Sequence, residues 1–307
     1  MRRDGAGLGK DLPDTPWKSD DSRENNVYSP PPDAAEEQRM RTRHDHAARA
    51  LAVTLGGGEE RWGWAGRTLG RPGVTGDGRR VWLRLVSAPA GKASGKTWEG
   101  ATDAQQAFGD LHGHRPALLA VHDEAEDGTV HRAELSEHLD QDVISDDPVL
   151  RVPDGLPAAW WTALGSALGT VADVTTDRIA VRQEYIHRAL PEFLGVPAPD
   201  AITWTTAHGD LHWANLTAPG LRILDWEGWG RAPYGYDQAT LYAYSLLRPA
   251  TAARVRAAFP DLDAPQTWTG QAVIAAELLQ TLSRGDNHEL AGPLHEWADR
   301  LRARSPR

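Results

Sequence analysis

The sequence of 307 residues contains no cysteine, two methionines and three phenylalanines. The absence of cysteine excludes disulfides, thiolate nucleophiles and zinc sites built on cysteine. No apolar run approaches the ~20 residues that cross a bilayer, and no apolar stretch follows the basic N-terminal residues as a secretory signal would require. We therefore expect a cytoplasmic protein.

An excess of positive charge is also missing. The chain has 33 Lys and Arg against 43 Asp and Glu, a formal net charge of -10. This balance argues against a nucleic-acid partner, because phosphate backbones are bound by positive surfaces. It is compatible with a cationic substrate. The length allows two lobes, each with a core of its own.

The most informative stretch is Ala207–Glu227, which reads A-H-G-D-L-H-W-A-N-L-T-A-P-G-L-R-I-L-D-W-E. It holds Asp210, Asn215 and Asp225 around the turn Ala218-Pro219-Gly220. We expect the proline to fix φ and the glycine to supply a positive φ at the corner. The apolar residues after the turn predict a short strand that leads into Asp225. Asn215 and Asp225 should then face each other across a hairpin.

These oxygen-bearing side chains suit a magnesium ion carried by a polyphosphate. Mg²⁺ prefers octahedral oxygen ligation and commonly takes one or two protein oxygens, with water and substrate phosphates completing its shell. Asn215 and Asp225 could supply the protein oxygens. Asp210, on the loop before the hairpin, would then orient a hydroxyl and accept its proton. Phosphoryl transfer needs little beyond such positioning and charge neutralisation.

The segments H-G-D-L-H-W-A-N and I-L-D-W-E resemble the catalytic and metal-binding segments of the aminoglycoside phosphotransferase and choline kinase family. The resemblance covers roughly residues 58–290. It implies an α+β, two-lobed, protein-kinase-like fold: a small lobe with a mostly antiparallel sheet of about five strands plus a helix, and a larger, mainly helical lobe. It also implies ATP, or GTP, with Mg²⁺ as the phosphoryl donor.

By this resemblance Asp210 is the catalytic base, and His208 is a second catalytic-loop residue that braces the loop by hydrogen bonding. Asn215 and Asp225 are the metal ligands. His212 is a second-rank candidate for contact with substrate or metal. Glu227, which stands where the family has a glycine after Asp225 and Trp226, is another.

We expect the chain to divide into three parts. Residues 1–33, rich in Gly, Pro, Asp and Ser, predict a disordered or loosely attached tail. Residues 34–139 would form an N-terminal helix and the nucleotide-binding small lobe, with backbone groups near residues 136–140 holding the adenine. Residues 140–307 would form the helical large lobe with the catalytic loop and metal site.

Periodicity predicts the individual elements. A helix starts at the N-cap Asp33 and runs to Gly56, with its first half exposed to solvent. Two strands flank the turn Gly76-Asp77-Gly78, and two more lie between residues 115 and 139. Further helices are expected from residue 96 to 111, in the large lobe at 157–174, 177–190, 267–282 and 288–304, and from Asp237 onward. Asp237 could be a helix-dipole partner or could hold the catalytic loop from below.

Arg84 lies in the second of these strands. Alternation places it on the same face as Trp82 and Val86, where a positive charge favours a nearby anion. By resemblance it occupies the position of the lysine that binds the nucleotide phosphates, although an exposed strand arginine is an open alternative. Glu99, on the following helix, is a candidate partner for Arg84 and a second cofactor-binding residue; a solvated glutamate is equally compatible.

A P-loop enzyme is the competing interpretation. The stretch G-K-A-S-G-K-T, residues 91–97, follows a strand and precedes a helix, but it is one residue short of G-x-x-x-x-G-K-[ST]. Lys96 would be its phosphate-binding lysine. This interpretation leaves His208, Asp210 and Asn215 without a role. The glycines at 63, 66 and 70 do not form G-x-G-x-x-G and are compatible with hairpin glycines or with a phosphate loop.

The acceptor is expected to be a small-molecule hydroxyl compound, such as a cationic aminoglycoside or an amino alcohol, with no nucleic-acid or membrane partner. The sequence leaves a second class open, a catalytically silent nucleotide-binding module of the same fold. The presence of Asp210, Asn215 and Asp225 together favours the active enzyme. Arginine in place of lysine at position 84 and the irregular glycine loop favour the silent module.

Overall fold

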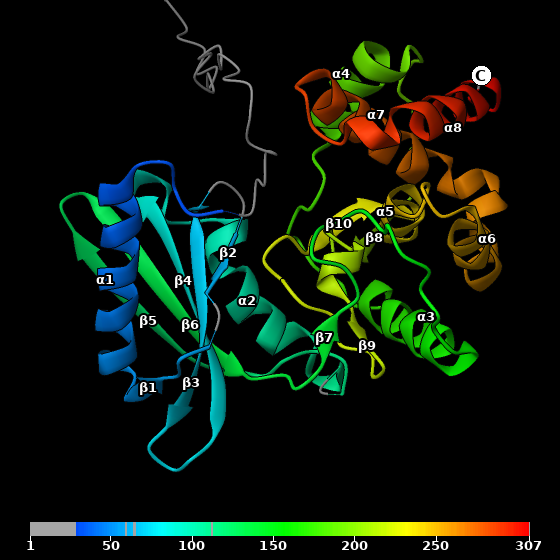
Figure 1. Cartoon of the computed structure of the whole chain (residues 1–307). Coiled ribbons are helices and arrows are strands. Elements are labelled where there is room, and N and C mark those ends of the chain that lie inside the picture. The colour runs from blue at the N-terminus through cyan, green and yellow to red at the C-terminus, as the bar shows by residue number, and fades with distance from the viewer. Residues whose placement is uncertain (1–28, 59, 64–65, 112, 307) are drawn as a thin grey trace, which may run out of the picture.

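The computed structural model describes residues 29–306 except 59, 64–65 and 112. Most of the expected tail, residues 1–28, lies outside the described residues. The described chain forms a sheet-based part and a helical part, which lie side by side in Figure 1. Each part has its own core of buried apolar side chains. No helix in the described ranges is long and apolar enough to cross a membrane.

The first part is an antiparallel sheet of six strands in the order β1-β3-β4-β6-β5, with β2 paired to β3. The strands are β1 (Val53–Leu55), β2 (Arg61–Trp62), β3 (Thr68–Thr75), β4 (Arg80–Pro89), β5 (Leu118–Glu126) and β6 (Thr129–Glu137). The predicted turn at residues 76–78 joins β3 and β4. Both neighbours of β4 run antiparallel to it, so the sheet lacks the parallel βαβ unit in which a P-loop follows its strand.

Alternation along β4 separates its two faces, as expected. Val81, Leu83 and Leu85 are almost fully buried and pack beneath helix α1 (Ala34–Ala50). The intervening positions, which include Arg84, point to the opposite face. Helix α2 (Lys96–Ala107) lies on that face, since Arg132 of β6 donates to the Trp98 carbonyl of α2 at 2.5 Å. The sheet is therefore covered by one helix on each side (Figure 1).

Two expectations for the N-terminal helix were wrong. The helix ends at Ala50 instead of reaching Gly56, and Val53–Leu55 pair with β3 as a strand. Its first half is not a solvated helix either, because Met40 and His44 are fully buried against the sheet. A histidine can occupy that position because both of its ring nitrogens have hydrogen-bond partners.

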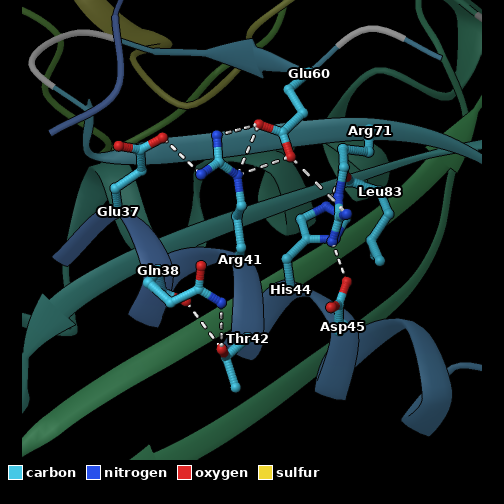
Figure 2. Close-up of polar contacts among 9 residues, drawn as sticks. All are labelled: Glu37, Gln38, Arg41, Thr42, His44, Asp45, Glu60, Arg71 and Leu83. Carbon is cyan, nitrogen blue, oxygen red and sulfur yellow. Dashed lines mark hydrogen bonds and ion pairs between the residues drawn. The ribbon is translucent and has the colours of Figure 1, made fainter. Parts of the chain in front are cut away.

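Figure 2 shows the polar contacts of His44. Its Nε2 lies 2.8 Å from the Leu83 carbonyl oxygen of β4, and its Nδ1 accepts a hydrogen bond from Arg71 of β3 at 3.2 Å. Arg71 is in turn paired with Asp45. Burial, followed by the nearby Arg71 charge, lowers the pKa of His44 to about 4, against the opposing hydrogen bond to Leu83. The ring is therefore neutral at pH 7, with Nε2 as the donor.

The second part is mainly helical, as predicted. Its helices are α3 (Ala158–Ala172), α4 (Gln183–Ala189), α5 (Tyr236–Tyr244), α6 (Pro249–Ala258), α7 (Trp268–Ser283) and α8 (Ala291–Ala303). Helix α6 was not predicted. Two small antiparallel sheets pair β8 (Trp204–Ala207) with β10 (Gly230–Pro233), and β7 (Asp142–Val143) with β9 (Thr217–Ala218).

Helix α2 belongs to both parts. Its residue Ala104 and the capping residue Phe108, which follows its C-terminal end, join the core of the helical part. The Phe108 ring packs against Trp226 and Trp229, with ring centroids 4.8 and 4.7 Å apart, and the Trp229 indole donates to the Gly100 carbonyl at 3.0 Å. The segment after Asp225 is thus fixed against the helix that covers the sheet.

Candidate active site

The loop that carries Asp210 begins where β8 ends. The backbone N–H groups of His208 and Gly209 donate to the two carboxylate oxygens of Asp237, at 2.6 and 2.9 Å. Asp237 lies in the first turn of α5 and is buried. Gly209 has φ of +85°, and a Cβ there would come within 2.6 Å of the Gly228 carbonyl oxygen. The aspartate therefore holds the loop from below, which is one of the two roles expected for it.

His208 is fully buried within the loop. Its Nε2 lies 2.8 Å from the Leu224 carbonyl oxygen, and its Nδ1 accepts a hydrogen bond from the Asp210 N–H at 3.3 Å. Burial lowers its pKa, although the charges of Asp237 and Asp210 oppose the shift. The neutral ring with its two hydrogen bonds braces the loop by linking it to the segment that precedes Asp225.

The two arms of the predicted hairpin lie side by side, but the expected strand leading into Asp225 was wrong, because residues 221–224 contribute a single bridge residue, Ile223, and no strand. Leu216 and Ile223 form a bridge, and the Leu224 N–H donates to the Asn215 carbonyl at 2.8 Å. The expected positive φ at Gly220 was wrong, because Gly220 is not among the described glycines with positive φ. A Cβ at this position would instead come within 2.6 Å of the Gln141 side chain. The glycine therefore leaves room for the Gln141 side chain.

Asp210 is about half exposed, with 51% of its side-chain surface open to solvent. One of its carboxylate oxygens lies 3.4 Å from His212 Nε2. Its backbone carbonyl accepts a hydrogen bond from Asn215 Nδ2 at 2.9 Å. Surrounding protein would raise the pKa of Asp210, but the neighbouring His212 and the Asn215 amide outweigh this and lower it. The group is an ionised, accessible carboxylate at neutral pH.

His212 is buried beside Asp210 and Asn215. Its Nε2 lies 3.3 Å from Asn215 Nδ2. Its Nδ1 is buried and has no hydrogen-bond partner within the described ranges. The residue therefore contacts two of the three core side chains, which supports its selection as a candidate from sequence.

Asp225 follows the hairpin in a left-handed conformation, with φ of +56°. This conformation is uncommon for a residue with a side chain. Burial raises the pKa of Asp225, against the opposing charge of Arg84, and the nearby carboxylate of Asp210 raises it further. The negative charge of Asp210 therefore acts on Asp225.

Arg84 reaches from the sheet toward Asp225. Its guanidinium lies 3.2 Å from Glu134, 2.5 Å from Glu227 and 3.9 Å from Asp225. Burial by itself would lower the pKa of Arg84, but these carboxylates raise it well above its ordinary value. Arg84 therefore carries a permanent positive charge beside the predicted metal ligand.

The expected pairing of Arg84 with Glu99 was wrong. Glu99 forms no hydrogen bond or ion pair with Arg84 in the described chain, and its charge acts on Arg132 instead. Glu134 takes the expected position because it is the direct cross-strand neighbour of Arg84 in the β4–β6 register. Glu134 was missed from sequence, since the register between strands fifty residues apart cannot be read from their patterns.

A cavity of about 330 Å³ opens beside Asp210 in the helical part. Helices α4, α5 and α7 and the catalytic loop form its walls. None of the helix residues was selected from sequence, because positions on three separate helices converge here only in the fold. The lining residues are Tyr185, Gly209, Asp210, Tyr236, Thr240, Tyr244, Ile274, Glu277, Leu278, Gln280 and Thr281.

The donor set fits magnesium better than a metal held by the protein alone. No group of three or more His, Cys, Asp and Glu side chains in the described residues could hold a metal ion. Asp225, with 37% of its side chain exposed, offers a carboxylate. Asn215 commits its Nδ2 to the Asp210 carbonyl, which keeps the amide fixed and its oxygen available. One carboxylate and one amide oxygen leave most ligand positions to water and phosphate, as Mg²⁺ prefers.

No protein-family model and no curated protein sequence matches this chain. Solved structures do. An amicoumacin kinase in complex with AMP-PNP and Ca²⁺ is 12% identical, with 89% of this chain and 97% of that chain covered and a TM-score of 0.53. An aminoglycoside phosphotransferase in a ternary complex with ADP and hygromycin B is 13% identical, with 86% and 99% covered and a TM-score of 0.55.

A macrolide 2'-phosphotransferase from Brachybacterium faecium is 17% identical, with 87% of this chain and all of that chain covered and a TM-score of 0.51. Similarity at this level of identity shows the fold. The chain has the two-lobed, protein-kinase-like fold of these small-molecule phosphotransferases, which confirms the fold class predicted from the two motif segments.

Proposed function

We propose that this chain is a small-molecule kinase that transfers the γ-phosphoryl group of ATP, or of GTP, to a hydroxyl of an acceptor bound in the cavity beside Asp210. The observation that carries the proposal is the position of Asp210. Its carboxylate is ionised and half exposed, borders the cavity, and interacts electrostatically with Asp225 across the hairpin.

Each of these residues has a separate role in the proposed reaction. Asp210 orients the acceptor hydroxyl and takes its proton while the hydroxyl oxygen forms the bond to the γ-phosphorus. The bond between that phosphorus and the β,γ-bridging oxygen breaks, and the nucleoside diphosphate, ADP or GDP, leaves. Asn215 and Asp225 would hold Mg²⁺, which neutralises charge on the phosphates when bound. Arg84 supplies a fixed positive charge from the sheet, 3.9 Å from Asp225.

The lowered pKa of Asp210 suits this role only in part. A carboxylate with a lowered pKa is a weaker base, so Asp210 contributes mainly by orienting the acceptor hydroxyl. The hydroxyl proton is transferred to Asp210 late, after formation of the phosphorus–oxygen bond has made the hydroxyl more acidic. His208 and Asp237 keep the carboxylate in position through the hydrogen bonds they make to the loop.

The proposal is tested by replacing the carboxylate while preserving its shape. Asp210→Asn should lower acceptor-dependent ATP consumption by about 10²–10⁴-fold and leave nucleotide affinity, measured by calorimetry with and without Mg²⁺, close to that of the wild type. Asp173→Asn at the C-terminal end of α3 removes a carboxylate elsewhere and serves as the matched control. Unchanged turnover in Asp210→Asn would refute the proposed role.

A catalytically silent nucleotide-binding module is the second candidate. The observation in its favour is the Arg84 guanidinium 3.9 Å from Asp225, because that positive charge competes with a metal ion for the carboxylate. This candidate predicts nucleotide binding that does not depend on Mg²⁺, together with no turnover on a broad panel of hydroxylated acceptors. The active kinase predicts tighter nucleotide binding with Mg²⁺ and loss of that dependence in Asp225→Asn.

A further inference from the structure

We infer that a second cavity, where the C-terminal ends of α6 and α8 meet α7, binds a small phosphomonoester that also carries a hydroxyl group. The cavity has a volume of about 320 Å³, which is within the range of small-molecule sites. It shares no lining residue with the cavity beside Asp210. The inference therefore concerns a separate site and goes beyond the proposed function.

The charged residues that line this cavity are all arginines. Arg256 lies in the last turn of α6, Arg300 lies in the last turn of α8, and Arg304 caps that helix. No acidic side chain of the described residues lines the cavity, although the whole chain has a net charge of -10. A helix end by itself favours basic residues in its last turn, but here two helix ends direct them into one space. The cavity therefore favours an anion.

Two of these arginines are held in place by one residue, Asp263. Its carboxylate pairs with Arg256, and its backbone carbonyl accepts a hydrogen bond from Arg304 at 3.1 Å. Arg300 makes no hydrogen bond or ion pair with any residue that the structure describes, although Glu296 precedes it by one helical turn. The guanidinium N–H groups of Arg300 are therefore available to a ligand.

Two nearly buried polar side chains in the cavity wall also have unused hydrogen-bonding groups. Trp297 is 3% exposed and Gln271 is 5% exposed. The Gln271 Nε2 donates to the Leu262 carbonyl at 2.7 Å and to Thr267 Oγ1 at 3.0 Å, which fixes the amide. Its Oε1 and the Trp297 indole N–H have no partner in the described part of the chain. Neither atom is sealed inside the protein, so both are accessible from the cavity that these residues line.

These groups together define the chemistry of the ligand. Guanidinium groups that converge from two helices suit a tetrahedral phosphate, whose oxygens accept hydrogen bonds from several directions, better than a planar carboxylate. The Trp297 indole adds a further donor. The Gln271 oxygen can only accept a hydrogen bond, so it requires a hydroxyl on the same molecule. A hydroxylated phosphomonoester, such as a sugar phosphate, meets both requirements.

The first test compares three probes by calorimetry on the full-length wild-type protein, without Mg²⁺ and near physiological salt. Ribose 5-phosphate carries both the phosphate and hydroxyls, ribose lacks the phosphate, and inorganic phosphate lacks the hydroxyls. We expect ribose 5-phosphate to bind at least about tenfold more tightly than either of the others. The inference is overturned if ribose or inorganic phosphate binds equally well, or if ribose 5-phosphate does not bind.

The second test removes one positive charge from the cavity. Arg300→Gln should weaken ribose 5-phosphate by about tenfold, the effect of one charge-assisted contact. Arg49→Gln is the matched control, because Arg49 is also an exposed arginine in the last turn of a helix, α1. It should leave the affinity unchanged. Equal losses in the two variants, or no loss in Arg300→Gln, contradict the inference.

A third variant tests the hydroxyl contact. Gln271→Met keeps the length of the side chain and removes its oxygen, so the preference for ribose 5-phosphate over inorganic phosphate should fall to about threefold or less. An unchanged preference contradicts the contact. Should this variant fail to fold, the ratio of these two probes on the wild-type protein decides.

Binding of the sugar phosphate at the active site would give a different pattern. Its affinity would then persist in Arg300→Gln and fall in Arg84→Lys, and this result overturns the inference. The measurement needs no turnover, so a failure of the proposed kinase activity does not affect it.

Discussion

The guanidinium of Arg84 lies 2.5 Å from the Glu227 carboxylate, so one ion pair connects strand β4 of the sheet to the segment that follows Asp225 in the helical part. The same guanidinium contacts Glu134 on the neighbouring strand. Only 22% of the Arg84 side chain is exposed. The two parts of the fold are therefore joined by charge at the point where the phosphates are expected to bind.

Removal of Arg84 should lower the stability of the folded protein. Arg84→Ala leaves Glu134, Glu227 and Asp225 facing one another, and breaking a largely buried pair costs about 3–5 kcal/mol. We expect that loss in the free energy of unfolding by urea, together with weaker nucleotide binding. Arg84→Lys should lose less, because it keeps the charge. Arg80→Ala on the same strand, where 58% of the side chain is exposed, should change stability by less than about 0.5 kcal/mol.

Asp237 should be essential for both stability and turnover. Its two carboxylate oxygens accept the His208 and Gly209 N–H groups, whereas Asp237→Asn offers one oxygen and turns an amide N–H toward a donor. We expect a loss of about 2–4 kcal/mol in the free energy of unfolding and a lower kcat. Asp299→Asn, on the surface of α8 with 73% of the side chain exposed, is the control. A variant at 237 that behaves like this control would contradict the bracing role.

His44 should make stability depend on pH. Its pKa is lowered from 6.5 to about 4 in the folded protein, so the unfolded chain binds the proton more readily. Its contribution to stability is full above pH 6.5 and is lost as the pH falls toward 4, by up to about 3 kcal/mol. Urea unfolding between pH 7 and pH 4.5 measures this loss. His44→Gln, which retains a donor for the Leu83 carbonyl, should show a flatter profile, while His295→Gln on α8 should match the wild type.

Gly100 should not tolerate a side chain. A Cβ at this position would lie 2.3 Å from the Glu227 carbonyl oxygen and 2.5 Å from its Cα, and both are backbone atoms that cannot rotate away. We expect Gly100→Ala to lower the melting temperature and to weaken nucleotide binding by displacing the segment after Asp225. Gly169→Ala, in an exposed part of α3 with no atom within 4 Å of its Cβ, should instead stabilise by about 0.5–1 kcal/mol.

Several features could be predicted from sequence because they depend on neighbours along the chain. The hairpin between Asn215 and Asp225 follows from a turn between two short apolar runs, and the two faces of β4 follow from strict alternation. The two-lobed fold followed from the two motif segments in the right order. Asp210 and Asn215 contact each other because they lie five residues apart on one short loop.

The remaining features depend on contacts between distant segments. Glu134 faces Arg84 through the strand register, and Tyr185, Tyr236 and Glu277 meet from three helices. The burial of Met40 and His44 was not predicted. A histidine is expected at the surface unless its hydrogen-bond partners, here the Leu83 carbonyl and Arg71, are known. Helix α6 was missed because its alanines and arginines show little apolar periodicity.

Helix α5 both anchors the catalytic loop and forms part of the cavity wall. Its residue Asp237 holds the catalytic loop, and the adjacent Tyr236, with Thr240 and Tyr244, forms a wall of the cavity. A rigid helix transmits a small shift along its length, so a molecule that pushes on this wall also displaces the anchor of the loop. Acceptor affinity and turnover should consequently vary together across substitutions in this helix, and poorly fitting acceptors should misalign the catalytic carboxylate as well as bind weakly.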